Sequence, residues 1–360
     1  MHSKLDLFGE FDAVSREEWI EEVKRYLKGK PMEGLDWNSD SGLVVEPYPS
    51  PNTVAPLGIA DLNSQNNWKI VEHIKVGEVA TANKQALEAL KWGAESLQFE
   101  FGTLPTADEL RLLLSKIHLS MIDIVFLGDT IQQSAMEFLK NLQEATEGQP
   151  VKGAVELGQQ VSLECVLFIK DYLPKLSVVD VAIAQEGNLI ENLANMLSHV
   201  SVCIDGLLAK GIEINTISQY FRLKVEVDDN YFIELSKIRA IKRLWLGILE
   251  AYEATEASLP HIAVITKSAA TDNQHRNMIT ATAQTMAAAI GGANSILVTP
   301  STDWPTADTF SLRIARNVQH LLKMESYLDR VMDPAMGSYY IESISQKIIE
   351  KSWLKFHELV

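Results

Sequence analysis

Cysteine and long apolar runs are both scarce in this chain. Only two cysteines occur among 360 residues, Cys165 and Cys203, and neither belongs to a Cys-x-x-Cys or Cys/His spacing. This excludes a disulfide framework, and it predicts two small buried side chains in a reducing, cytoplasmic compartment. No apolar stretch reaches about eighteen residues, so the sequence predicts no membrane-spanning helix. Residues 1–6 resemble neither a signal peptide nor a transit peptide.

Basic residues are the scarcer kind of charge. The chain has 32 lysines and arginines against 48 acidic residues, which gives a net charge of −16. Such a charge repels phosphate backbones and anionic lipid, so we expect no nucleic acid or membrane partner, and a phosphorylated ligand requires a local basic cluster. With 46% apolar and 22% charged residues, the composition is that of an ordinary globular protein, and the length suits one barrel-sized domain or two smaller ones.

What the chain does have, from Trp68 onward, is a regular alternation of apolar runs and amphipathic stretches. The apolar runs predict eight strands, at 68–76, 97–102, 122–128, 151–157, 178–183, 223–227, 262–266 and 295–299. Helical patterns follow at 81–93, 107–117, 130–147, 159–173, 188–210, 230–253, 277–290 and 308–326. The stretch 159–173 also fits a long strand, and only the count of eight favours a helix. The alternation predicts an α/β fold, a (β/α)8 TIM barrel.

Ahead of the barrel, the sequence predicts an extended arm and a linker. Ser15 and Glu18 form a capping box at the start of a helix. Prolines then gather in the following segment, where they remove backbone donors and hold the chain extended. We therefore divide the chain into a helical arm (1–45), a Pro-rich linker (46–67) and the barrel (68–360). Two further capping boxes are predicted, at Thr106 with Glu109 and at Thr130 with Gln133.

Three motifs stand in order near the end of the sequence: Gly291-Gly-Ala-Asn-Ser-Ile296, Ile314-Ala-Arg-Asn-Val-Gln319 and Asp333-Pro-Ala-Met-Gly-Ser-Tyr-Tyr-Ile-Glu342. They predict a glycine turn into a strand, a helix, and a second turn. They resemble the GG-x-Q-S-L-H, IARN-x-Q and DP-x-x-GSYY-x-E motifs of the methylmalonyl-CoA mutase family, and the resemblance extends back to about Leu7. The residues that keep the family pattern are Gly291, Gly292, Ser295, Arg316, Asn317, Gln319, Asp333, Pro334, Gly337, Ser338, Tyr339, Tyr340 and Glu342.

The resemblance implies a barrel whose N-terminal arm contacts a partner subunit. In active family members a thioester substrate threads the barrel axis, and a separate C-terminal domain presents cobalamin to the barrel mouth. The cofactor supplies radical chemistry, while the protein excludes water and orients the substrate. Such a site requires a tyrosine, a histidine donor to the thioester oxygen, and arginines for carboxylate and phosphate groups.

These site residues are missing from the matching positions. Where the family has tyrosine and histidine after the fifth strand, this chain has Asp180 and Val181, and valine cannot donate a hydrogen bond. Thr280 replaces an arginine before the seventh helix, and Leu297 replaces the last histidine of the glycine motif. Residues 72–79 contain neither the family's arginine nor its tyrosine. We therefore expect no catalytic, cofactor-binding or metal-binding residue in this chain.

The cobalamin signature Asp-x-His-x-x-Gly is also missing, and only His357 follows His320 among the histidines. The sequence stops at Val360, inside a helix predicted to start near Ile341. We expect no flavodoxin-like cobalamin-binding domain in this chain, where it is either absent or truncated. Adenosylcobalamin is expected on a partner, the large subunit.

The other polar residues have structural interpretations. Six histidines lack any metal-binding spacing, namely His73, His118, His199, His261, His275 and His320. Asp228 and Asp229 are typical of a helix N-cap pair, with catalytic use as the alternative. A solvated face or a subunit contact is favoured over a phosphate contact for three basic residues of one helix, Arg239, Lys242 and Arg243. Packing beneath the barrel is favoured over a ligand contact for Tyr339 and Tyr340.

Three functions remain open. We favour the small, non-catalytic subunit of a heterodimeric, adenosylcobalamin-dependent methylmalonyl-CoA mutase of propionate metabolism, an isomerase that interconverts methylmalonyl-CoA and succinyl-CoA. The second function is an active acyl-CoA mutase of altered specificity with a separate cobalamin-binding chain. The third is a stand-alone barrel of unrelated activity, for which a Lys267 Schiff base is conceivable. Its candidate groups near strand ends are Gln98, Glu100, Asp129, Glu156, Asp180, Asp228, Lys267 and Ser268.

Overall fold

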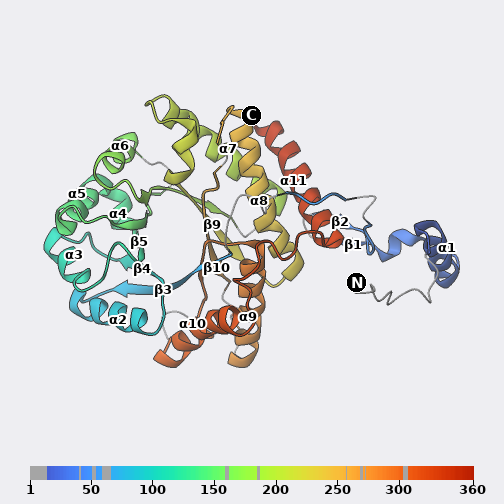
Figure 1. Cartoon of the computed structure of the whole chain (residues 1–360), viewed down its shortest axis with the longest axis horizontal. Coiled ribbons are helices and arrows are strands. Elements are labelled where there is room, and N and C mark those ends of the chain that lie inside the picture. The colour runs from blue at the N-terminus through green and yellow to red at the C-terminus, as the bar shows by residue number, and fades with distance from the viewer. Residues whose placement is uncertain are drawn as a thin grey trace, which may run out of the picture.

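A parallel sheet that curls into a barrel forms the centre of the computed structural model (Figure 1). In their order around the sheet, the strands are β7 (Leu176–Ser177), β6 (Lys152–Val155), β5 (Asp123–Leu127), β4 (Ser96–Phe101), β3 (Lys69–Val76), β11 (Ser295–Leu297), β10 (His261–Thr266), β9 (Phe221–Val227) and β8 (Val179–Ile183). The structure describes residues 14–39, 42–50, 54–58, 66–158, 162–184, 187–256, 258–267, 271, 273–302 and 307–360. Within these residues the other sheet is a two-stranded hairpin.

The fifth strand of the barrel is split into β7 and β8, which are separated only by Val178. β7 pairs with β6, whereas β8 pairs with β9, so the two pieces together close the barrel. The Val178 amide donates to the carbonyl oxygen of Tyr220 at 3.0 Å, which keeps the bend hydrogen-bonded. Counting the two pieces as one strand confirms the predicted (β/α)8 barrel. The predicted strand 178–183 begins two residues too late, because it omits β7.

Alternating side chains separate the hydrophobic core from the barrel axis. On β9, Leu223 and Val225 belong to the core between sheet and helices, whereas Arg222 and Lys224 form ion pairs on the opposite side of the strand, around the axis. This is the period of two expected for a strand, in which successive side chains point to opposite faces. The core is therefore outside the barrel, and charged groups occupy its interior.

Helices cover the outside of the barrel (Figure 1). Their bounds are α2 (Val79–Lys91), α3 (Ala107–Leu113), α4 (Asp129–Gln133), α5 (Ala135–Thr146), α6 (Leu163–Tyr172), α7 (Leu189–Leu208), α8 (Tyr231–Ala251), α9 (Gln274–Gly291), α10 (Thr309–Met324) and α11 (Tyr339–Leu359). The ambiguous stretch 159–173 is helical from Leu163 onward, while 159–161 lie outside the described residues.

Two of the three predicted capping boxes are confirmed. Ser15 caps α1 (Arg16–Leu27), and Thr106 caps α3, each with its glutamate reaching back. The box at Thr130 is wrong, because Gly128 occupies the N-cap of α4 and Thr130 lies inside that helix. The predicted helix 130–147 is two helices that meet at Ser134.

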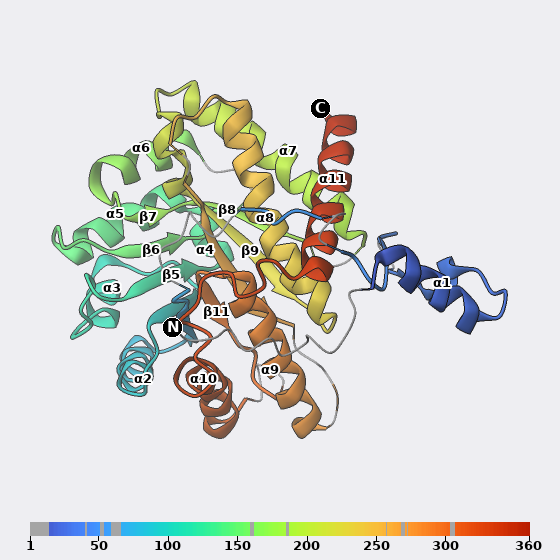
Figure 2. The ribbon, with the colours of Figure 1, turned by 45° about the vertical axis from the view of Figure 1, so that its right-hand side comes forward.

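The N-terminal arm projects from one side of the barrel (Figure 2). It holds α1, the short helix η1 (Met32–Leu35), and a hairpin of β1 (Trp37–Asn38) and β2 (Val44–Val45). No residue of α1 is buried. The hairpin, in contrast, is fixed to the barrel, because Leu43 and Val45 are fully buried and two α11 lysines donate to hairpin carbonyls. Across the described residues, no helix combines the length and the apolar character that a membrane span requires.

Candidate functional site

A cavity of about 730 Å³ opens at the C-terminal end of the barrel, where barrel enzymes carry their active sites. His73, Gln98, Glu100 and Leu297 line its inner part, and Arg313 lies on the α10 side. His73 Nε2 lies 3.0 Å from Glu100 Oε2, and Gln98 Nε2 lies 3.2 Å from His73 Nδ1. Burial lowers the pKa of His73, although Glu100 acts against the shift. Both ring nitrogens are thus engaged.

Below this cavity, four charged side chains meet across the barrel axis. Arg222 Nη1 donates to Glu156 Oε1 at 3.2 Å and to Asp180 Oδ2 at 3.0 Å. Lys224 Nζ donates to the other Glu156 oxygen at 2.9 Å. Arg222, Glu156 and Asp180 are all buried. We refer to these four residues as the axial ion network.

The two carboxyl groups of the network titrate differently. Burial raises the pKa of Asp180 to about 6, despite the opposing effect of Arg222, and the adjacent Glu156 carboxyl adds to the rise. Burial also acts to raise the pKa of Glu156, but Lys224 and Arg222 together outweigh it and hold that pKa below its usual value. Because like charges in close contact disfavour joint ionisation, Asp180 is the carboxyl that takes up a proton first.

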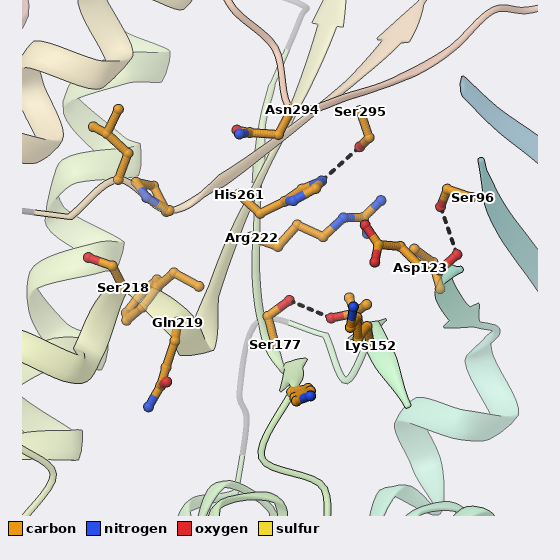
Figure 3. Close-up of a pocket in the computed structure, with 17 residues that line it drawn as sticks. Ser96, Asp123, Lys152, Ser177, Ser218, Gln219, Arg222, His261, Asn294 and Ser295 are labelled. Atoms are coloured by element: carbon orange, nitrogen blue, oxygen red, sulfur yellow. Dashed lines mark hydrogen bonds between the residues drawn. The ribbon is translucent and has the colours of Figure 1, made fainter. Parts of the chain in front are cut away.

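A second cavity, of about 420 Å³, opens at the opposite, N-terminal end of the barrel (Figure 3). It shares no lining residue with the first cavity. Arg222 and His261 line it, and His261 Nε2 lies 2.8 Å from Ser295 Oγ. Burial, followed by repulsion from Arg222, lowers the pKa of His261 to about 3. The axial ion network therefore lies between two separate cavities.

The four positions at which family site residues are replaced are not brought together. Asp180 belongs to the axial ion network, and Leu297 lines the C-terminal cavity. Val181 is 4% exposed and packs in the core outside the barrel, since it alternates with Asp180 along β8. Thr280 is half-buried on α9 and lines neither cavity. The Val181 side chain therefore points away from the barrel axis, whereas that of Asp180, the other matched position on β8, points toward it.

The motif residues Asp333 and Glu342 hold a buried arginine. Arg239 donates to both oxygens of Asp333, at 2.9 and 2.8 Å, and to both oxygens of Glu342, at 3.1 and 2.9 Å. Glu342 also accepts from the amide of Gly337 at 3.0 Å. The predicted solvated face is therefore wrong for Arg239, which is 1% exposed, and for Lys242, which is 6% exposed. They are buried because α8 packs against α9 and α11.

The glycine pair has a steric role. The Lys242 ammonium donates to the carbonyl oxygen of Gly291 at 3.0 Å. Gly292 has a φ of +81°, and a Cβ there would collide with the same ammonium, while a Cβ at Gly291 would crowd Ile238. Burial lowers the pKa of Lys242 to about 8. Glycine therefore allows the close approach of α8 to the turn before β11.

The middle motif anchors α10. Arg316 Nη1 donates to Glu72 on β3 at 2.8 Å, and Gln319 accepts from the indole of Trp68 at 3.1 Å. Tyr340 packs edge-on against Phe232 with ring centroids 5.4 Å apart. Five of the residues that keep the family pattern are exposed: Asn317, Pro334, Gly337, Ser338 and Tyr339. Because Tyr339 is 40% exposed, packing beneath the barrel is not its role.

The acidic pair after β9 does not cap α8. Asn230 occupies the N-cap, while Asp228 pairs with Lys267 at 2.7 Å and Asp229 accepts from Gln284 at 3.0 Å. The hydrogen bond to Asp228 raises the pKa of Lys267, which disfavours the neutral amine that a Schiff base requires. The other strand-end candidate, Ser268, lies outside the described residues.

Sequence reasoning missed Arg222, which contacts both carboxyl groups of the network. The predicted strand began at Leu223 and so excluded it. The signal was present in the alternation Phe221-Arg-Leu-Lys-Val-Glu-Val227, which places one polar residue after each apolar one. An arginine in that pattern predicts a charge on the barrel axis and therefore a carboxylate partner on a neighbouring strand.

The fold and its interior define a (β/α)8 barrel protein whose axis is closed by ion pairs. Residues 142–359 match the family model described as methylmalonyl-CoA mutase. The chain therefore belongs to the methylmalonyl-CoA mutase family.

Three relatives carry more specific names. The chain is 30% identical to "Methylmalonyl-CoA mutase small subunit" of Porphyromonas gingivalis, an alignment that covers 98% of this chain and 64% of that protein. It is 24% identical to the protein of the same name from Propionibacterium freudenreichii subsp. shermanii, over 99% of this chain and 63% of that protein. It is 26% identical to "Probable methylmalonyl-CoA mutase small subunit" of Mycobacterium bovis, over 82% of this chain and 52% of that protein. The chain thus spans between 52% and 64% of the length of these relatives.

Proposed function

We propose that this chain is the barrel region of the small, non-catalytic subunit of a methylmalonyl-CoA mutase, and that it serves as the structural partner of a catalytic large subunit in the cytoplasm. The axial ion network carries this proposal. A thioester that threads the axis would have to displace Arg222 from Glu156 and Asp180, and removing one partner from a buried ion pair costs about 3 to 5 kcal/mol. Interconversion of methylmalonyl-CoA and succinyl-CoA then takes place on the large subunit.

The residues at the barrel mouth do not fit cobalamin. A cobalt ligand requires a histidine nitrogen that is free to coordinate. His73, the histidine in the C-terminal cavity, has both ring nitrogens engaged by Gln98 and Glu100. We therefore assign adenosylcobalamin to the large subunit.

The arm supplies a surface for the partner. Trp19, Val23 and Leu27 recur every four residues along α1, which places them on one face of the helix. These three side chains are half-buried, and the Trp19 ring already packs against the Tyr48 ring with centroids 4.9 Å apart. Because none of them is fully buried, the remaining part of this apolar face is available for contact. A helix of twelve residues gains most of its stability from packing, so a partner surface would also stabilise it.

The test is the native mass of this chain, alone and co-expressed with a mutase large subunit from the same organism. We expect a stable one-to-one complex, and no uptake of cobalamin by the isolated chain. Replacing both Trp19 and Val23 by Asp should abolish the complex without changing the melting temperature of the barrel. Glu17→Ala, a change on the exposed side of the same helix, should leave the complex intact.

Two results would contradict the proposal. One is persistent failure of the two chains to associate. The other is a saturable rise in the melting temperature of the isolated chain with methylmalonyl-CoA, which would show that the chain binds this thioester. A ligand at about a hundred times its dissociation constant adds about 2.7 kcal/mol to the free energy of unfolding, so such binding would be detected. That second result would favour an active acyl-CoA site in the C-terminal cavity.

A further inference from the structure

The N-terminal cavity has the composition of a binding site. Strand starts and the loops before them supply its walls, so polar side chains from several strands face one space (Figure 3). Three of its residues are cationic, Lys152, Lys175 and Arg222, and one is acidic, Asp123. In a chain with a net charge of −16, three cations around one cavity are a local exception. Such a cluster attracts anions that the rest of the surface repels.

The cationic donors in this cavity are available. Among the residues that the structure describes, neither the Lys152 nor the Lys175 ammonium has a hydrogen-bond or ion-pair partner, although the charge of Lys152 acts on the nearby Asp123 carboxyl. Arg222 is 4% exposed, and its Nε is buried without an acceptor although its Nη1 contacts the axial ion network. A buried guanidinium N–H without a partner is costly, so this atom points to a missing acceptor.

Several neutral polar groups of the cavity, in contrast, already have partners. The Ser96 hydroxyl donates to the carbonyl oxygen of Asp123 at 3.0 Å, and the Ser177 hydroxyl donates to that of Gly153 at 3.2 Å. His261 contacts Ser295 and has no positive charge at neutral pH. An incoming ligand is therefore met by ammonium and guanidinium groups on one side and by the Asp123 carboxylate on another.

Asp123 restricts the kind of anion. A carboxylate repels a fully deprotonated oxyanion, but it accepts a hydrogen bond from an anion that retains a hydroxyl. Inorganic phosphate at neutral pH carries both charged oxygens and a P–OH group, whereas sulfate carries no proton. The cavity volume of about 420 Å³ suits a small ligand, and the axial ion network prevents a long one from continuing along the axis.

We propose that the N-terminal cavity binds a compact phosphoryl anion with a P–OH group, whose charged oxygens contact Lys152, Lys175 and Arg222 and whose hydroxyl donates to Asp123. The site lies at the end of the barrel opposite the C-terminal cavity. It goes beyond the structural role proposed above and does not depend on it. The small-subunit fold would thereby carry a ligand site of its own.

Isothermal titration of the 360-residue chain with inorganic phosphate, and separately with sulfate at matched ionic strength, tests the proposal. We expect one saturable phosphate site and roughly tenfold weaker sulfate binding, the effect of losing one charge-assisted hydrogen bond. Lys152→Gln and Lys175→Gln should each weaken phosphate binding by roughly the same factor. Lys140→Gln, which removes an exposed charge on α5, should leave it unchanged.

Asp123→Asn tests the selectivity itself. An amide can donate to either anion, so the phosphate-to-sulfate affinity ratio should fall to about one in this variant, while its melting temperature reports that it still folds. Absence of saturable phosphate binding, or lysine variants that bind like the unmodified chain, would overturn the proposal. So would coenzyme A displacing phosphate with higher affinity, since this would identify a site for an extended nucleotide. None of these readouts requires the large subunit.

Discussion

Replacing Asp180 by asparagine should stabilise the protein at neutral and alkaline pH. The asparagine side chain matches the protonated carboxyl in shape and can still accept from Arg222, which retains Glu156 as its charged partner. Burial raises the pKa of Asp180 from 3.8 to about 6, and a shift of this size corresponds to at most about 3 kcal/mol of free energy of unfolding. The variant removes the cost of ionising this buried group.

The sign of the pH dependence follows from the raised pKa. Below about pH 3.8 both folded and unfolded chains carry a protonated Asp180, so its stabilising contribution is complete. Between that value and about pH 6 the folded protein holds a proton that the unfolded chain releases, so the contribution is progressively lost as the pH rises. The stability difference between Asp180→Asn and the unmodified protein should therefore grow from about pH 4 to pH 7 and then level off.

Urea unfolding monitored by tryptophan fluorescence from pH 4 to pH 8 measures this difference. Asp171→Asn, an exposed change on α6, is the matched control and should show no such trend. An Asp180→Asn variant that is less stable than the unmodified protein at pH 8 would refute the reasoning, because the ionised carboxylate would then gain more from Arg222 than burial costs it.

Two further changes test the packing around the barrel. Arg222→Met leaves two buried carboxylates without their shared cation and should lower the free energy of unfolding by about 3 to 5 kcal/mol, measured by urea titration. Arg276→Met, an exposed change, should alter the free energy of unfolding little. Equal effects of the two changes would show that the axial ion network does not stabilise the fold. Gly292→Ala should lower the melting temperature more than Gly211→Ala does. Both positions have a positive φ, but only at Gly292 would a Cβ collide with the Lys242 ammonium. Equal decreases in melting temperature would show that the ammonium moves away without a cost in stability.

The order of strands and helices could be predicted because the apolar runs are short and regularly spaced. The split of the fifth strand could not, since β7 has only two residues and its pairing with β6 is a long-range property. The division of the predicted helix 130–147 into α4 and α5 at Ser134 could not be predicted either, because the sequence on both sides of Ser134 favours a helix.

The interior of the barrel was less predictable than its outline. A motif match places a residue along a strand but does not show which face it occupies, so it could not separate Val181, which packs in the outer core, from Asp180, which lies on the axis. Arg239 was interpreted as a surface residue because its partners, Asp333 and Glu342, follow it by about a hundred positions in the chain. Charges that are buried by distant partners leave little local signal.

The contact between the arm hairpin and α11 also has a consequence for the order of events during synthesis. Lys347 and Lys351 donate to the carbonyl oxygens of Val44 and Gly42, at 2.8 and 2.7 Å. Glu342 likewise accepts from the amide of Leu57 at 3.3 Å. The hairpin segment therefore finds its anchor only after some three hundred further residues have been synthesised. The hairpin is thus fixed in place only once α11, which follows the last barrel strand, has been synthesised.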